Sequence, residues 1–172
     1  METRPNALVV GYGTLLARES LGRTIGTDRA REVALIPVIV EGFRRLYNYA
    51  PAHYAGSGRS VEGSIERAAA NVERAEGCRF NALAFEATEE EIGALDGRER
   101  EYDRVRVPLL DFETGEVLGE GETYSVPAGA GTLERDPARL LPHRRDLLYA
   151  RIGAYRISDA FGQIFDATTY LA

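Results

Sequence analysis

The sequence contains no lysine, only one cysteine and no long hydrophobic run. Without a lysine amine the protein cannot form a Schiff base with a carbonyl substrate. Because Cys78 is the only cysteine, no disulfide can form within the chain, and we expect a protein of the reducing cytoplasm. No apolar stretch approaches the roughly 20 residues of a membrane-spanning helix, and the first residues lack the layout of a secretory signal. We therefore expect no membrane partner.

The charge and the few histidines exclude two further classes. A net charge of −6 without a long run of one sign disfavours a nucleic-acid-binding protein. The only two histidines, His53 and His143, lie 90 positions apart with no further ligands at a suitable spacing, so we predict no metal site. A chain of 172 residues is typical of one domain, which needs neither a metal nor a disulfide to hold its core.

Short β-rich segments dominate the chain up to about residue 126. They predict strands at residues 7–10, 32–40, 42–49, 79–87, 102–110 and 122–126. Residues 17–31 predict a short helical turn and a loop, and residues 50–64 predict a long loop near the mouth of a site. Residues 65–72 fit either a helix or a strand.

Helices are predicted in the middle and at the end of the chain. Thr88 and Glu91 have the spacing of a capping box, which predicts a helix from there to about Gly97. From residue 136 onward, leucine-rich and alanine-rich segments predict two helices, broken around Gly153 and Ser158. Many short strands with few helices favour a small mixed barrel or a curled sheet over a doubly wound α/β fold.

The first candidate site segment is Gly11-Tyr12-Gly13-Thr14-Leu15, directly after a predicted buried strand. Glycines on both sides of Tyr12 permit positive φ and close approach of the backbone, so successive N–H groups can bind an anion. The alternative is an ordinary turn with Tyr12 in the core. The segment is neither a dinucleotide-binding motif, since residue 16 is Leu, nor a P-loop, since no lysine follows.

The second candidate segment surrounds Glu99, between the predicted helix and the strand that begins at Tyr102. A carboxylate that is partly desolvated at this junction would have a raised pKa, as a general base at neutral pH requires. The alternative is a surface charge that pairs with Arg98 or Arg100 at little energetic value.

Four stretches, taken in order, resemble the gamma-glutamylcyclotransferase-like superfamily, which includes ChaC-type and AIG2-like proteins. Residues 11–15 are similar to its Tyr-Gly-Ser-Leu loop, with Thr14 in place of Ser. Residues 42–48 resemble its Gly-aromatic-Arg-Arg strand, and residues 81–91 its strand and helix before the catalytic position. Residues 95–104 resemble its Leu-Asp-x-x-Glu and Tyr-x-Arg signature. The resemblance spans roughly residues 7–126.

The resemblance implies an α+β fold, with a small mixed β-barrel flanked by helices, and it also implies a reaction and a set of site residues. Glu99 would be the catalytic general acid and base, and Tyr12, Gly13, Thr14, Leu15 and Tyr102 would bind the substrate. The α-amine of a γ-glutamyl amine, amino acid or peptide would attack its own γ-carbonyl and release 5-oxoproline, with no cofactor. The spacing between Glu99 and Tyr102 is shorter than in most members, so Glu101 and Asp96 are alternative cavity-facing carboxylates.

The resemblance also divides the chain. We predict a gamma-glutamylcyclotransferase-like domain over residues 1–130 and a helical extension over residues 131–172 that packs on the same domain. The leucine-rich segment 140–148 can pack on its own domain or on a second copy, so a homodimer is an open alternative. A catalytically inactive domain that binds γ-glutamyl ligands, or that regulates, is the alternative function. A structural or partner-binding role of the C-terminal helices is a third.

Overall fold

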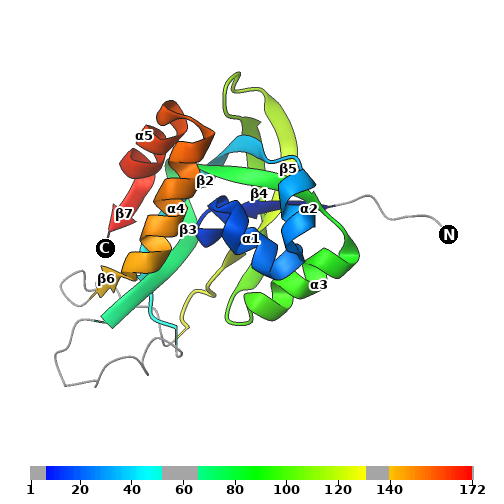
Figure 1. Ribbon diagram of the computed structural model, residues 1–172. Coiled ribbons are helices and arrows are strands. Elements are labelled where there is room, and N and C mark those ends of the chain that lie inside the picture. The colour runs from blue at the N-terminus through cyan, green and yellow to red at the C-terminus, as the bar shows by residue number, and fades with distance from the viewer. Residues whose placement is uncertain (1–6, 52–65, 131–139, 172) are drawn as a thin grey trace.

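The computed structural model describes residues 7–51, 66–130 and 140–171. Within these ranges seven strands form one sheet, and helices lie on its outside (Figure 1). In chain order the elements are β1 (Ala7–Gly11), the short 3-10 helix η1 (Thr14–Leu16), α1 (Arg18–Ile25), α2 (Thr27–Glu32), β2 (Ile36–Tyr49), β3 (Glu66–Ala87), α3 (Glu89–Arg98), β4 (Asp103–Asp111), β5 (Val117–Ser125), β6 (Leu140–Pro142), α4 (Arg144–Ile157), α5 (Asp159–Thr168) and β7 (Thr169–Leu171).

The sheet has the strand order β6-β3-β1-β5-β4-β2-β7, with an additional pairing of β2 with β3. Five strands therefore pair in a cycle, from β1 through β5, β4, β2 and β3 back to β1. The predicted α+β class is confirmed as a mixed fold with a seven-stranded sheet. The short strands β6 and β7, which pair in parallel with β3 and β2, were not predicted.

Glycine bulges explain the main errors in the predicted strands. β2 runs without a break through Gly42, and β3 runs through Gly77 over 22 residues. Both glycines have a positive φ, 76° and 75°, and the register between the two strands shifts there. A glycine in this conformation bends a strand and does not end it. The sequence prediction had instead divided β2 into two strands, and in β3 it had predicted a strand at residues 79–87 only, with residues 65–72 left open between helix and strand.

Other elements also differ from the predictions. Residues 17–31, predicted as a turn and a loop, form most of α1 and α2, and β5 begins at Val117. The break between the two C-terminal helices lies at Ser158 alone, because Gly153 is buried inside α4. Most of the predicted loop 50–64 lies outside the described residues. Among the described residues, no helix has the length and apolar character to cross a membrane.

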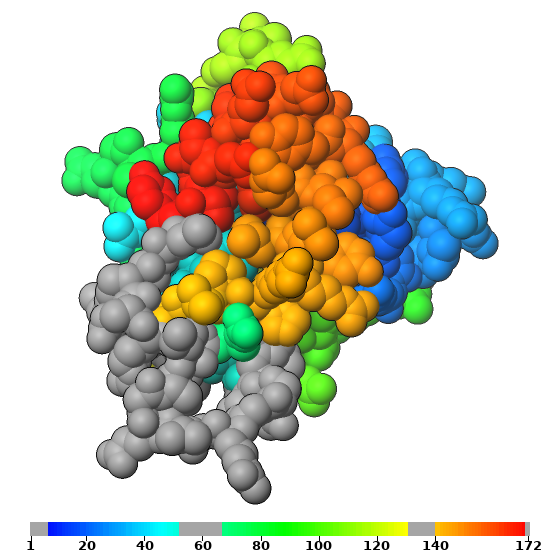
Figure 2. All heavy atoms as spheres, turned by 60° about the vertical axis from the view of Figure 1, so that its left-hand side comes forward, coloured from blue at the N-terminus to red at the C-terminus, as the bar shows by residue number. Residues whose placement is uncertain are grey.

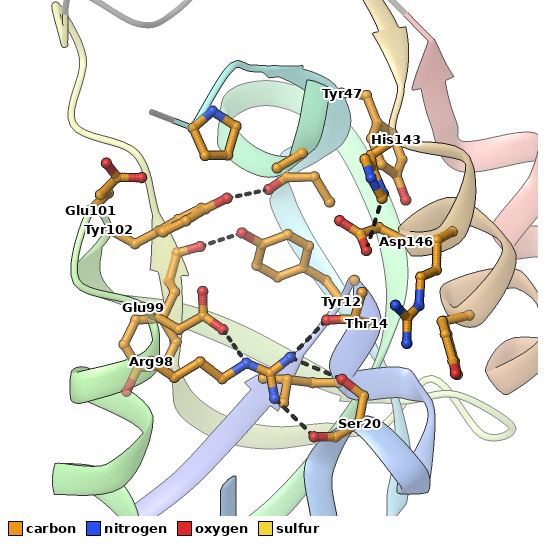
Figure 3. A pocket seen from close by; sticks show the side chains of 18 of the residues that line it. Tyr12, Thr14, Ser20, Tyr47, Arg98, Glu99, Glu101, Tyr102, His143 and Asp146 are labelled. Carbon is orange, nitrogen blue, oxygen red and sulfur yellow. Dashed lines mark hydrogen bonds and ion pairs between the residues drawn. The ribbon is translucent and has the colours of Figure 1, made fainter. Parts of the chain in front are cut away.

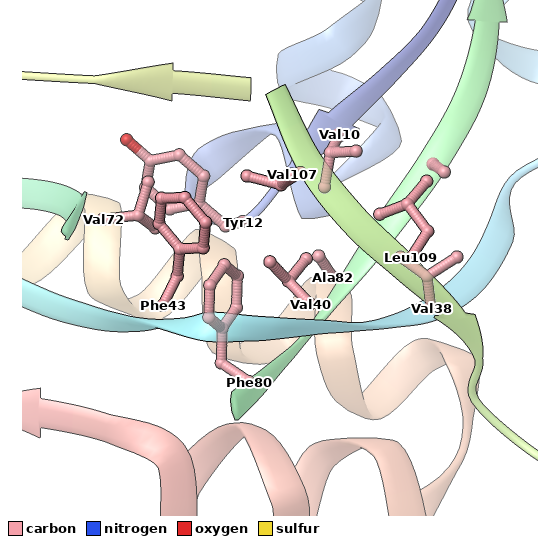
Figure 4. Close-up of a cluster of buried hydrophobic side chains, with 11 residues drawn as sticks. Val10, Tyr12, Val38, Val40, Phe43, Val72, Phe80, Ala82, Val107 and Leu109 are labelled. Carbon is pink, nitrogen blue, oxygen red and sulfur yellow. The ribbon is translucent and has the colours of Figure 1, made fainter. Parts of the chain in front are cut away.

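The central core lies between the paired strands. Alternate residues of each strand point inward, so Val38 and Val40 of β2 face Val107 and Leu109 of β4 (Figure 4). Phe80 of β3 closes the cluster at one end, where the Tyr12 ring meets it edge-on at 6.3 Å between centroids. The side chain of Tyr12 is therefore both part of this core and close to the turn that follows β1.

The two C-terminal helices pack on the outside of the sheet. Ala150 and Ala154 of α4 and Phe161 and Phe165 of α5 share a buried cluster with Leu16 and Leu83. α4 lies so close to η1 that a Cβ added at Gly153 would stand 2.5 Å from the carbonyl oxygen of Leu16. The position of η1 therefore depends on α4. The domain boundary at residue 130 stays a prediction.

A buried arginine fastens the end of the chain to the sheet. Arg45 of β2 has no solvent exposure, and burial lowers the pKa of Arg45 to about 9. Its guanidinium donates to the carbonyl oxygen of Asn81 at 2.7 Å, to that of Phe165 at 3.2 Å and to the hydroxyl of Thr169 at 2.9 Å. It also lies 4.0 Å from the centroid of the Phe165 ring. These contacts to neutral oxygens and to an aromatic ring satisfy the buried cation.

Candidate functional site

A cavity of about 850 Å³ opens between η1, α1, the end of α3 and the start of α4 (Figure 3). All the residues predicted for the site line it, namely Tyr12, Gly13, Thr14, Leu15, Glu99 and Tyr102. Of the two alternative carboxylates, Glu101 also lines the cavity, whereas Asp96 is absent from its wall. The tertiary structure therefore brings the two sequence segments together.

The turn after β1 is compact because two glycines allow close packing. A Cβ at Gly11 would come within 2.7 Å of the Leu15 Cβ, and one at Gly13 within 3.3 Å of the Ala70 Cβ. Neither glycine has a positive φ. Of the two roles predicted for them from the sequence, close approach of the backbone is therefore found, whereas positive φ is not. Within η1 the first intrahelical donor is the N–H of Leu16. The N–H groups of Thr14 and Leu15 form no hydrogen bond within this turn.

Tyr12 fits both interpretations that the sequence left open. It is buried in the central core, and it also lines the cavity. Its hydroxyl donates a 2.7 Å hydrogen bond to the carbonyl oxygen of Tyr124. Burial, and then the nearby charge of Glu99, raises the pKa of Tyr12 well above its ordinary value. Tyr12 is therefore a neutral hydrogen-bonding wall of the cavity and does not act as a base.

Glu99 is the carboxylate that the structure partly removes from water. It is the C-cap residue of α3, and its N–H donates to the Leu95 carbonyl at 2.8 Å. Its side chain is 19% exposed, and Oε1 lies 3.1 Å from Nε of Arg98. Burial raises the pKa of Glu99, and the charge and hydrogen bond of Arg98 oppose that rise. A carboxyl group in this state can exchange a proton at a pH closer to neutrality than a solvated one.

The capping box that was predicted from the sequence helps to hold Glu99 in place. The Thr88 hydroxyl accepts from the N–H of Glu91, and the Glu91 carboxylate accepts from the N–H of Thr88. Arg29 of α2 donates to the same Glu91 carboxylate at 2.6 Å. α3 is thereby fixed at its start, and its last turn presents Arg98 and then Glu99 to the cavity.

Arg98 has a larger role than the sequence suggested. The sequence predicted at most a weak surface pair, but the side chain is only 25% exposed. Its guanidinium donates to the Thr14 hydroxyl at 2.8 Å and to the Ser20 hydroxyl and carbonyl at 2.9 Å (Figure 3). It also donates to the Thr24 hydroxyl at 2.9 Å. Arg98 thus connects Glu99 to η1 and α1. No motif in the sequence indicated these partners, which come from residues 74–84 positions away.

The neighbouring acidic residues have other partners. The exposed Glu101 accepts a hydrogen bond from the Tyr49 hydroxyl, and the Tyr49 ring packs edge-on against Tyr102. The Tyr102 hydroxyl donates to the Ala70 carbonyl oxygen at 2.9 Å. Asp96 accepts from the Tyr124 hydroxyl at 2.8 Å and also pairs with an arginine of β4. Glu99 is therefore the least exposed carboxylate of this segment on the cavity wall.

The opposite wall was missed by sequence reasoning because α4 carries no recognisable motif. It includes His143, Arg145, Asp146 and Tyr149. Nδ1 of His143 lies 3.4 Å from Oδ1 of Asp146, one helical turn away. Among the described residues, no group of three His, Cys, Asp or Glu side chains is arranged to hold a metal ion.

Comparisons with known proteins identify the fold. No protein-family model and no curated protein sequence matches the chain. A solved structure of gamma-glutamyl cyclotransferase matches 95% of this chain and 88% of its own, with a TM-score of 0.66 and 14% identity. The fold is that of gamma-glutamyl cyclotransferase. The resemblance read from the sequence motifs is confirmed at this level.

Two further solved structures match this chain over nearly its whole length. The uncharacterized protein loc79017 from Homo sapiens has a TM-score of 0.68 at 14% identity, covering 96% of this chain and 89% of its own. At5g39720.1 from Arabidopsis thaliana has a TM-score of 0.54 at 17% identity, covering 99% and 98%. The matches therefore extend past residue 126, where the recognisable motifs end, and take in the C-terminal helices.

Proposed function

We propose that this protein is a γ-glutamyl cyclotransferase-type enzyme that releases 5-oxoproline from a γ-glutamyl amine, amino acid or peptide. The observation that carries the proposal is Glu99, a partly buried carboxyl with a raised pKa, on the same cavity as the turn at residues 12–15. The cyclotransferase fold supports the reaction class, and the motif resemblance assigns Glu99 to the catalytic position.

The reaction requires one proton-transferring group. The substrate's α-amine attacks its γ-carbonyl carbon, a new carbon–nitrogen bond closes the five-membered ring, and Glu99 accepts the proton that the amine loses. The bond to the leaving nitrogen then breaks, and Glu99 donates the proton to that nitrogen. Because the nucleophile belongs to the substrate, the protein needs only to hold the glutamyl group bent and to shuttle the proton.

The turn after β1 is suited to hold the glutamyl group. The N–H groups of Thr14 and Leu15, which make no bond within η1, can donate to the α-carboxylate of the substrate. Tyr12 and Tyr102 supply two aromatic walls, and their hydroxyls are fixed by the carbonyl oxygens of Tyr124 and Ala70. Such fixed walls restrict the substrate to few conformations, which favours ring closure.

A second candidate is a binding or regulatory domain without turnover. The observation that favours it is the 3.1 Å ion pair between Arg98 and Glu99, because a paired carboxylate is a weaker base. Such a domain would bind glutamate-like anions or 5-oxoproline in the same cavity. It differs from the enzyme only in the absence of turnover.

The test is release of 5-oxoproline from a panel of γ-glutamyl compounds by the wild type, Glu99→Gln and Glu101→Gln. Both substitutions remove one carboxylate from the cavity wall, so they form a matched pair. We expect Glu99→Gln to lower turnover by at least about 100-fold, the range of general acid–base catalysis, with the fold retained. We expect Glu101→Gln to keep most of the activity.

The other outcomes separate the alternatives. Full activity of Glu99→Gln together with loss in Glu101→Gln would move the catalytic role to Glu101. If the wild type releases no 5-oxoproline from any compound but is stabilised thermally by 5-oxoproline or glutamate, the binding domain is correct.

A further inference from the structure

The cavity is larger than a single glutamyl group needs. Pockets of about 300–1,000 Å³ hold whole drug-sized ligands, and this one measures about 850 Å³. Glu99 and the turn at residues 12–15 form one part of its wall. The remaining wall, contributed by α1 and α4, is available to the part of the substrate that leaves with the amine.

Two arginines converge on this outer wall. Arg23 of α1 and Arg145 of α4 stand on the ring of Tyr149, with guanidinium carbons 5.7 Å and 5.5 Å from its centroid. We call these two residues the arginine pair. Figure 2 shows the atoms of α1 and α4 in contact on this face of the molecule. The two cations come from segments more than 100 residues apart, so the tertiary fold alone brings them together.

The arginine pair has no carboxylate partner within the described part of the chain, whereas the cavity's acidic groups have partners. Glu99 pairs with Arg98, Asp146 lies against His143, and Glu101 accepts from a tyrosine hydroxyl. Hydrogen bonding from Arg145 and then from Arg23 lowers the pKa of Tyr149, which indicates a positive potential at this place.

This placement is electrostatically unfavourable without an anion. Two like charges on one ring repel each other, and Arg145 stands in the first turn of α4, where the helix dipole disfavours a cation. An oxyanion between the two guanidinium groups would remove both penalties and accept hydrogen bonds in the planar geometry that arginine prefers. In a protein of net charge −6, the pair offers an anion an attractive position beside the cavity.

We propose that the arginine pair and Tyr149 bind an oxyanion, a carboxylate or a phosphate, on the leaving-group side of the substrate. This inference rests on the proposed function, because that function defines which end of the substrate is the leaving group. It assigns to Arg23 and Arg145 the selection of γ-glutamyl compounds with an acidic leaving amine over those with a neutral or cationic one.

The test compares substrates that differ only in the anion. γ-Glutamyl-alanine, γ-glutamyl-ethylamide and γ-glutamyl-phosphoethanolamine share the glutamyl group, and the second has no charge on the leaving side. KM for 5-oxoproline release is measured for the wild type, Arg145→Gln and Arg23→Gln/Arg145→Gln. Arg144→Gln is the matched control, since it removes the same charge from the same helical turn but does not line the cavity.

We expect Arg145→Gln to raise KM about fivefold for the acidic substrates, which corresponds to the largest free energy usual for an exposed ion pair. The double variant should raise KM for these substrates further. KM for the ethylamide should be unchanged in all variants, and Arg144→Gln should match the wild type throughout. Whichever acidic substrate shows the larger rise identifies the anion. An equal rise for all three substrates would overturn the inference, because the pair would then bind the α-carboxylate of the glutamyl group.

A binding measurement keeps this test independent of turnover. Thermal stabilisation of the same variants by the same three compounds is recorded, with Glu99→Gln added to suppress 5-oxoproline release. If the wild type has no activity but the acidic compounds stabilise it more than the ethylamide, and Arg145→Gln removes that difference, the proposed reaction fails while the oxyanion site stands. Equal stabilisation by all three compounds, or none by any, overturns the oxyanion site.

Discussion

Gly153→Ala offers a sharp test of how the C-terminal helices support the site. A Cβ at this position would stand 2.5 Å and 2.6 Å from the carbonyl oxygen and carbon of Leu16, and 2.9 Å from the backbone nitrogen of Ala17. All three atoms are backbone, so no side chain can rotate away. α4 must therefore move from η1, the segment that carries Thr14 and Leu15 on the cavity wall.

The expected effect on stability follows from two opposing contributions. Overpacking a close contact costs about 1–3 kcal/mol, and replacing a helical glycine by alanine returns up to about 1 kcal/mol. Because all three clashing atoms are backbone, the upper part of the overpacking range applies, about 2–3 kcal/mol, and the net loss is about 1–2 kcal/mol in the free energy of unfolding. For a chain of this length it lowers the melting temperature by about 2–8 °C.

Gly93→Ala is the matched control for helix propensity. Gly93 is exposed in α3, and a Cβ there would meet nothing within 4 Å. The same substitution should therefore raise the melting temperature by about 2–4 °C, because only the propensity gain remains. Circular dichroism melts measure both variants. 5-Oxoproline release should fall in Gly153→Ala alone, as the turn shifts relative to Glu99.

The reasoning is refuted if Gly153→Ala melts at or above the wild-type temperature, as Gly93→Ala should. That result would mean that the contact between α4 and η1 is loose. The C-terminal helices would then not determine the geometry of the cavity.

Three further predictions concern the base, the buried cation and the helix cap. Arg98→Gln removes the charge that opposes the raised pKa of Glu99, so the pKa rises further and the acidic limb of the kcat/KM–pH profile should move to higher pH; an unmoved limb would count against Glu99 as the base. Arg45→Met leaves buried carbonyl and hydroxyl groups unpaired and should cost about 3 kcal/mol or more in urea unfolding. The adjacent Arg44→Gln breaks only a surface pair and should cost less than about 1 kcal/mol. Thr88→Ala removes the capping box and should lower stability by about 1 kcal/mol, or about 2–4 °C in melting temperature, and an unchanged melt would contradict that role.

The raised pKa of Glu99 also makes a prediction about stability. A carboxyl whose pKa is higher in the folded than in the unfolded state binds its proton more tightly when folded. Its ionised form therefore destabilises the fold at pH values above the folded pKa. We expect Glu99→Gln to melt higher than the wild type at neutral pH, and the difference to shrink as the pH falls through that pKa. A lower melting temperature at neutral pH would contradict this.

Local patterns in the sequence were sufficient for several elements. The Thr88–Glu91 spacing located the start of α3 because a capping box depends only on residues three positions apart. The order of the motifs was enough to identify the cyclotransferase fold. Residues 32–40 and 42–49 were predicted as two strands because the local signal for a bulge at Gly42 is the same as that for a turn, and only pairing with a partner strand distinguishes the two.

The sequence by itself determined the motif residues of the candidate site, whereas the tertiary structure decided their environment. Glu99 was one of several charges in its segment, and only the packing of α3 against α1 and η1 made it the least exposed carboxylate on the cavity wall. Arg98 and the arginine pair could not be found from spacing, since their partners lie far away in the chain. Burial and charge pairing arise from distant segments that meet in the folded protein, and no local pattern records them.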